Sequence, residues 1–88
     1  MRTPEECALL VMAVFKRLCD RPVPKPEGWV APQLSQGVIR EAIGDDLEAG
    51  QGIEYALDEL WIAEGAETPG MYFVTDIGFL ECWPRLEK

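Results

Sequence analysis

The hydrophobic positions at the start of the chain repeat with the spacing of a helix. The run Thr3-Pro4-Glu5-Glu6 predicts where this helix begins: threonine can cap a first turn, proline suits the first helical position, and Glu6 stands three residues after the cap. We expect the helix to continue to about Cys19. At 100° per residue, one face gathers the residues that we assign to the core: Cys7, Val11, Val14, Phe15 and Leu18.

The opposite side of this helix is also apolar, with Leu9 and Ala13 there and Leu10 beside them. A helix that is apolar nearly all round is usually buried on two sides. Two alternatives could bury this side of the helix: a homodimer formed through Leu9, Leu10 and Ala13, or packing of residues 21–33 against it. The prolines of that segment predict a stiff, extended connector that lets Trp29 fold back on the core. Its Pro-Val-Pro-Lys-Pro run is also a candidate ligand for a proline-binding groove.

Two further helices are predicted before residue 62. The first begins at the cap Ser35 and ends before a glycine, with an apolar stripe of Val38, Ile39, Ala42 and Ile43. Asp45-Asp46-Leu47-Glu48 then predicts a new helix start, with carboxylates at the positive end of the helix dipole. Gly50 and Gly52 weaken its first turns, so we expect the regular part from about Gln51. Its inward stripe comprises Ile53, Ala56, Leu57 and Leu60, joined at the edge by Trp61.

The hydrophobic period changes after Gly65. The range 66–74 predicts a short β-hairpin that turns at Thr68-Pro69-Gly70, after which Thr75 caps a short helix through Cys82 that Pro84 stops. The predicted fold class is therefore mainly α with a small β-hairpin (α+β): about three helices, a two-stranded hairpin and a short C-terminal helix. We expect a single domain over residues 1–88, with a helix in 1–20, the connector in 21–33 and a helix–turn–helix with its hairpin in 34–83.

The run from Leu57 to Leu80 carries a resemblance to a known family. It combines Leu-x-x-Leu at a helix end, a glycine one turn later, a hairpin, and then Tyr72-x-Val74-Thr75-Asp76-x-Gly78. This pattern is similar to the wing strand and following helix of winged helix-turn-helix proteins, in which Tyr-x-Leu-Thr-x-x-Gly recurs. The resemblance covers about residues 34–83. It implies that the third helix enters the DNA major groove and that the hairpin, or wing, contacts phosphates or the minor groove.

The charge distribution argues against DNA reading by that route. The net charge is −8, and no lysine or arginine lies between Arg40 and Arg85. The carboxylates in this interval are Glu41, Asp45, Asp46, Glu48, Glu54, Asp58, Glu59, Glu64, Glu67, Asp76 and Glu81. A typical nucleic-acid binder makes ~6–10 phosphate contacts, and each carboxylate near a phosphate would repel it. We therefore expect no nucleic-acid binding through this face.

Residues for catalysis or metal binding are scarce. The chain has no histidine, Ser35 is its only serine, and its three cysteines form no Cys-x-x-Cys pair. The pairs Asp45/Asp46 and Asp58/Glu59 could form a divalent-metal or glycosidase-like site, but a helix start and a solvated helix face explain them better. We expect no enzyme, no cofactor and no metal. The apolar run at 8–15 is too short to span a bilayer and lacks a cleavage site, which predicts a cytoplasmic protein.

These observations predict a protein-interaction module, an adaptor or inhibitor that docks a basic partner protein. The predicted binding residues are Glu48, Gln51, Tyr55, Asp58, Glu59, Ile62 and Glu67, with Tyr55 and Ile62 as anchors inside a carboxylate rim. The sharpest form of this hypothesis is a DNA mimic of phage type that occupies a surface otherwise used for nucleic acid. The alternative is a transcriptional regulator that binds DNA as a homodimer through an atypical basic surface of Lys16, Arg17 and Arg40.

Overall fold

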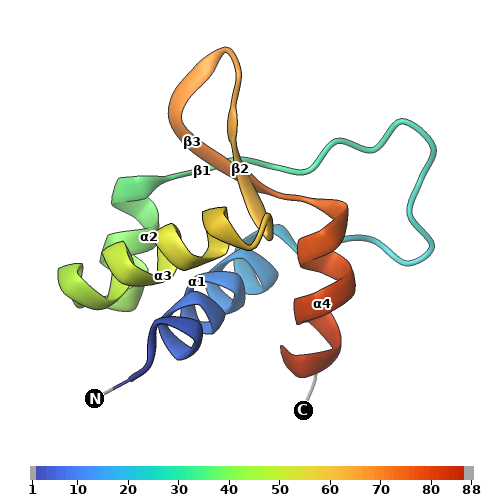
Figure 1. Ribbon diagram of the computed structural model, residues 1–88. Coiled ribbons are helices and arrows are strands. Elements are labelled where there is room, and N and C mark those ends of the chain that lie inside the picture. The colour runs from blue at the N-terminus through green and yellow to red at the C-terminus, as the bar shows by residue number, and fades with distance from the viewer. Residues whose placement is uncertain (1, 87–88) are drawn as a thin grey trace.

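The computed structural model describes residues 2–86, which form four helices and a three-stranded antiparallel sheet (Figure 1). In chain order the elements are α1 (Pro4–Cys19), β1 (Leu34–Ser35), α2 (Gln36–Ile43), α3 (Asp46–Asp58), β2 (Ile62–Gly65), β3 (Thr68–Val74) and α4 (Asp76–Leu86). The strand order is β1-β3-β2, so β3 lies between the other two strands. The expected α+β class and the hairpin are confirmed. The short strand β1 was not expected from the sequence.

The predicted start of α1 is confirmed in atomic detail. The Glu6 amide donates to the Thr3 hydroxyl at 3.2 Å, and the Thr3 amide donates to the Glu6 carboxylate at 2.8 Å. These bonds satisfy two amides that a helix start otherwise leaves without partners. The hydrogen bonds from Thr3 also lower the pKa of the Glu6 carboxyl.

α1 packs most extensively against α3, and a glycine determines how closely the two helices approach. A Cβ on Gly52 would overlap the backbone carbonyl of Cys7 and come within 2.8 Å of the Val11 side chain. The prediction that the regular part of this helix begins only near Gln51 was wrong, because α3 is helical from Asp46 onward. The Asp45 side chain caps it by accepting the Glu48 amide at 2.9 Å, and burial against α1 supports its first turns.

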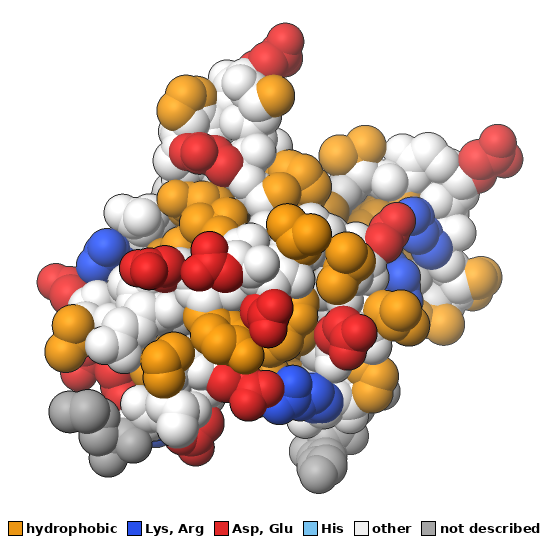
Figure 2. Space-filling model, viewed as in Figure 1, with side chains coloured by type: hydrophobic (Ala, Val, Ile, Leu, Met, Phe, Trp, Pro, Cys, Tyr) orange, Lys and Arg blue, Asp and Glu red, His pale blue; other side chains and the backbone are white. Residues whose placement is uncertain are grey.

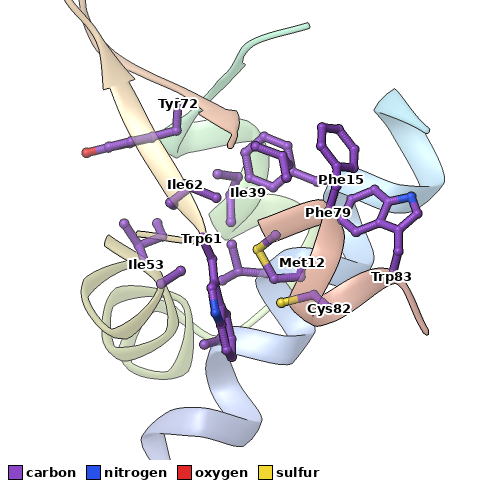
Figure 3. Packing of buried hydrophobic residues seen from close by; sticks show 14 residues of the cluster. Met12, Phe15, Ile39, Ile53, Trp61, Ile62, Tyr72, Phe79, Cys82 and Trp83 are labelled. Atoms are coloured by element: carbon purple, nitrogen blue, oxygen red, sulfur yellow. The ribbon is translucent and has the colours of Figure 1, made fainter. Parts of the chain in front are cut away.

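The side of α1 that carries Met12 and Phe15 packs against α4, whereas Ala13, on the side predicted to dimerise, is exposed. Figure 3 shows Met12 and Phe15 of α1 facing Phe79, Cys82 and Trp83 of α4 in the buried cluster. Trp29 does fold back, but its ring lies against Phe79, with 5.9 Å between the ring centroids. The assignment of Leu18 to the core was wrong: its side chain is 51% exposed, and the core instead takes Ala8 and Met12.

α3 ends earlier than the apolar stripe suggested, and this changes the direction of the chain. Leu60 has φ 62°, a left-handed conformation. The Trp61 amide bonds the Ala56 carbonyl at 2.9 Å and the Leu60 amide bonds the Leu57 carbonyl at 3.1 Å, the paired bonds of a Schellman helix end. Leu60 was expected to point inward but is 59% exposed, because the reversal turns its side chain away from the core.

The hairpin turns at residues 66–67, two residues before the predicted turn. β2 and β3 pair from Ile62 with Val74 as far as Glu64 with Tyr72, and the register then shifts so that Gly65 pairs with Thr68. The residues at 68–70, which carry the strongest turn signal in the sequence, lie inside β3 at this irregularity. Gly70 has φ 82° there, and its amide donates to the Glu64 carboxylate at 2.6 Å.

Thr75 joins the end of α3 to the start of α4. Its hydroxyl accepts the Gly78 amide at 3.1 Å, as expected for a helix cap, and donates to the Leu60 carbonyl. A Cβ on Gly78 would overlap the Trp61 carbonyl, so glycine lets α4 approach the chain that leaves α3.

Pro84 does not stop α4, which continues to Leu86. Within residues 2–86, no helix is long and apolar enough to cross a membrane.

Candidate functional site

The predicted binding residues come mainly from the outward side of α3. Gln51, Tyr55 and Asp58 follow one another at helical spacing, Glu48 lies in the first turn, Glu59 is the C-cap, and Glu67 is exposed at the hairpin turn. Ile62 does not belong to this surface. It is the first residue of β2 and is 1% exposed, because the left-handed Leu60 redirects the chain before it. Tyr55 and Ile62 therefore do not form the exposed pair of anchor residues that the sequence predicted.

A hollow of about 390 Å³ lies on this side of α3, lined by Pro4, Gln51, Glu54, Tyr55 and Asp58. Glu54 was missing from the predicted set. Positions 51, 54, 55 and 58 have the i, i+3, i+4, i+7 spacing of one helix face, so this spacing alone could have identified it. The hollow combines an aromatic wall with two carboxylates, which suits a cationic side chain.

Tyr55 links this surface to the core. Its ring meets Trp61 edge-on, with 5.6 Å between centroids and 64° between the planes. Partial burial raises the pKa of the Tyr55 hydroxyl, and the negative charges of Glu5 and Glu59 raise it further. The hydroxyl therefore remains protonated at neutral pH and acts as a hydrogen-bond donor at the edge of the hollow.

The carboxylates of α3 differ in whether a cation balances them. Glu48 pairs with Arg2 at 3.1 Å and Asp46 pairs with Arg40 at 3.9 Å. Among residues 2–86, no cation lies within ion-pair distance of Glu54, Asp58 or Glu59. Figure 2 shows acidic side chains spread across α3 and the hairpin, with basic side chains at the left and right of the molecule and low in its centre. We call Gln51, Glu54, Tyr55, Asp58 and Glu59 the acidic α3 face.

The alternative DNA-binding surface comprises two cations of α1, Lys16 and Arg17, and one of α2, Arg40. Lys16 lies over the Trp83 ring of α4, 5.6 Å from its centroid, and pairs with Asp20 at 3.3 Å. Arg17 lines a different hollow, beside the end of α2. Arg40 is held at the start of α3, where it donates to the Asp46 carbonyl at 3.2 Å. Lys16 is therefore engaged beside α4, whereas Arg17 and Arg40 lie near the end of α2 and the start of α3.

The cysteines are placed as core residues. Cys7, Cys19 and Cys82 are buried, and burial raises the pKa of each thiol, that of Cys82 to about 11. Thiols in that state are protonated at neutral pH and are poor nucleophiles and poor metal ligands. In the described part of the chain, no three histidine, cysteine or carboxylate side chains come close enough to hold a metal ion.

The side of α1 predicted to dimerise is partly occupied within the chain. Leu9 packs against the buried cluster and Leu10 is half-buried, whereas Ala13 is exposed.

Comparison with models of protein families, with curated proteins and with solved structures finds no match to this chain.

Proposed function

We propose that this chain is a non-enzymatic, winged-helix-like protein-interaction module whose acidic α3 face binds a basic surface of a partner protein. The order helix, strand, two helices, hairpin and closing helix supports the family resemblance, because β1 pairs antiparallel with β3 beside the hairpin. In the winged helix-turn-helix family, α3 corresponds to the helix that enters the major groove.

The observation that carries the proposal is the unbalanced charge of this helix. Glu54, Asp58 and Glu59 surround Tyr55 without a cation among residues 2–86 to neutralise them. Carboxylates at these positions would repel phosphates, whereas a basic protein surface complements them and is steered toward them. A partner surface that otherwise holds nucleic acid is the most specific version of this proposal.

A pull-down from native lysate with charge-reversed variants tests the proposal. The variant Asp58→Lys/Glu59→Lys should lose the partners captured by the wild type. The control Glu27→Lys/Glu41→Lys makes the same change in net charge at two exposed positions away from α3 and should retain them. Equal capture by both variants would show that α3 is not the binding face.

A gel-shift experiment with random DNA duplex at low salt separates the two function classes. We expect no binding, because few cations on the described surface are available for phosphates. Binding at micromolar concentration would favour the DNA-binding regulator. In that case, substitution of Lys16, Arg17 and Arg40 would show whether the predicted basic residues are responsible.

A further inference from the structure

The outer side of α4 carries an apolar stripe. Ile77 and Leu80 are 44% and 75% exposed, and Pro84 continues the stripe at the next helical interval. The inner side of the same helix buries Phe79 and Trp83 in the core. α4 is therefore apolar on two opposite sides, but only the inner side is covered among residues 2–86.

Leu60 extends this stripe beyond the start of α4. Its carbonyl accepts the Thr75 hydroxyl, which places it next to the first turn of α4. A left-handed conformation is unfavourable for a residue other than glycine, and glycine is the usual residue at this kind of helix end. The large apolar side chain of Leu60 is 59% exposed although its backbone is strained, and strained residues cluster at functional sites.

The stripe continues into a hollow between α4 and the connector. Val23, Leu80 and Pro84 contribute apolar walls to this hollow, whose volume is about 270 Å³. Figure 2 shows hydrophobic side chains running from the end of α3 along α4, with acidic side chains beside them. The hollow offers a place for one aliphatic side chain of a ligand.

Carboxylates flank the stripe on the side that faces α3. Glu81 lies one helical turn after Ile77 on its flank, and Glu59 immediately precedes Leu60. Among the nearby cations, Arg85 pairs with Glu5 of α1 at 3.3 Å, and Arg21, which lines the hollow, lies over the Phe79 ring, 4.7 Å from its centroid. An apolar stripe with unbalanced carboxylates along one edge complements a helix that has leucine-like residues on one side and lysine or arginine beside them.

We propose that Leu60, Ile77, Leu80 and Pro84, flanked by Glu59 and Glu81, receive a basic amphipathic helix of the partner protein. This inference rests on the proposed function and specifies the kind of segment that is bound. Charge selects this occupant over a second copy of the chain, because a copy would bring its own Glu59 and Glu81, while its Arg85 is paired with Glu5 and its Arg21 lies over Phe79.

A synthetic peptide provides a direct probe. Fluorescence anisotropy would compare a labelled helical peptide of about 18 residues, with leucines spaced three and four apart and lysines beside them, with a scrambled peptide of the same composition. We expect the ordered peptide to bind at least about tenfold more tightly, because only its leucines can align with the stripe.

Serine substitutions locate the binding site on α4. Ile77→Ser and Leu80→Ser should each weaken binding of the ordered peptide about tenfold. Leu47→Ser removes an exposed leucine from the first turn of α3, outside the stripe, and should change the affinity less than about twofold. Thermal melting of each variant verifies that the fold is retained.

The outcomes separate this inference from the proposed function. Equal affinity for both peptides, lost in Glu54→Lys/Asp58→Lys, would overturn the stripe as a site but support the acidic α3 face, because these two residues line the α3 hollow and do not flank the stripe. No binding of either peptide would overturn the stripe as a site, whereas the acidic α3 face is tested separately by the pull-down. A dimer in light scattering that Leu80→Ser converts to a monomer would overturn the inference, because the stripe would then be occupied by a second copy.

Discussion

The inner sides of α3 and α4 pack small and aromatic residues against the rest of the chain, whereas their outer sides leave large apolar residues exposed. On the inner side, Gly52 and Gly78 bring backbones into direct contact, and aromatic rings of α4 fill the space beside α1. On the outer side, Leu60, Ile77 and Leu80 project from the surface beside Glu59 and Glu81, for which residues 2–86 supply no cation within ion-pair distance. The inner side forms the packed core of the fold, whereas the outer side leaves apolar side chains exposed and is where we propose binding.

The largest effect is expected from a single methyl group on the inner side. Gly52→Ala should lower the free energy of unfolding by about 2–3 kcal/mol, because the new Cβ overlaps the Cys7 carbonyl and α1 must move away. Gly50→Ala is the matched control on the same helix. Its Cβ would meet only the Arg40 guanidinium at 3.8 Å, so the variant should gain about 0.5–1 kcal/mol from helix propensity. Urea denaturation measures both, and equal effects would contradict the close helix contact.

An ion pair at the edge of the inner side predicts a dependence on pH. Asp20 accepts the Trp83 indole N–H at 2.7 Å and pairs with Lys16 at 3.3 Å. The Trp83 hydrogen bond is the main reason that the pKa of Asp20 is lowered, and Lys16 adds to it. A lowered folded pKa means that the carboxylate stabilises the fold above its ordinary pKa and loses this effect as the pH falls through the folded value.

We therefore expect Asp20→Asn to be less stable than the wild type at pH 7, with the difference disappearing under acid conditions below about pH 4. Urea midpoints at several pH values measure this. Glu27→Gln, at an exposed position in the connector, should show no comparable trend. A constant difference between the wild type and Asp20→Asn across the pH range would argue against the role of the carboxylate charge.

Substitutions of Leu60 test whether the exposed leucine lowers the stability of the fold. Leu60→Gly should raise the free energy of unfolding by about 0.5 kcal/mol, because relief of the left-handed strain slightly exceeds the added freedom of the unfolded chain. Leu60→Ala keeps the strain and should show no gain. If Leu60→Gly is less stable than the wild type, the leucine side chain has a structural role, and its assignment to a binding surface is weakened.

The smallest effect is expected on the acidic α3 face. Glu54 and Asp58 are one helical turn apart, and like charges at this spacing destabilise a helix by about 0.2–0.5 kcal/mol. Glu54→Gln should therefore be slightly more stable than the wild type at low salt, with the difference screened at high salt. Thermal melting at two salt concentrations measures this, and a loss of stability would mean that Glu54 has a structural partner.

Much of the local structure could be predicted because its causes lie within a few residues. Thr3, Ser35, Asp45 and Thr75 each cap a helix by accepting an amide three residues later, so a short sequence window contains both partners. The hairpin turn was misplaced for a related reason. Pro69 and Gly70 carry the local turn signal, but pairing of β3 with β2 places them inside a strand.

The candidate site was only partly predictable. Helical spacing correctly placed Gln51, Tyr55 and Asp58 on one face and could have added Glu54. Ile62 was misassigned because helical spacing was continued past Asp58, where the chain leaves the helix through a left-handed leucine. Nothing in a leucine side chain signals that conformation, since glycine is the usual residue there.

The amino-acid sequence by itself determined where the helices begin and that the interval between Arg40 and Arg85 contains no basic residue, because caps and composition are local properties. Only the tertiary structure decided which apolar side chains are covered and which carboxylates are balanced. Gly52 contacts a carbonyl 45 positions away in the chain, at residue 7, and Glu48 pairs with Arg2. Such partners are distant in sequence and meet only when the helices pack.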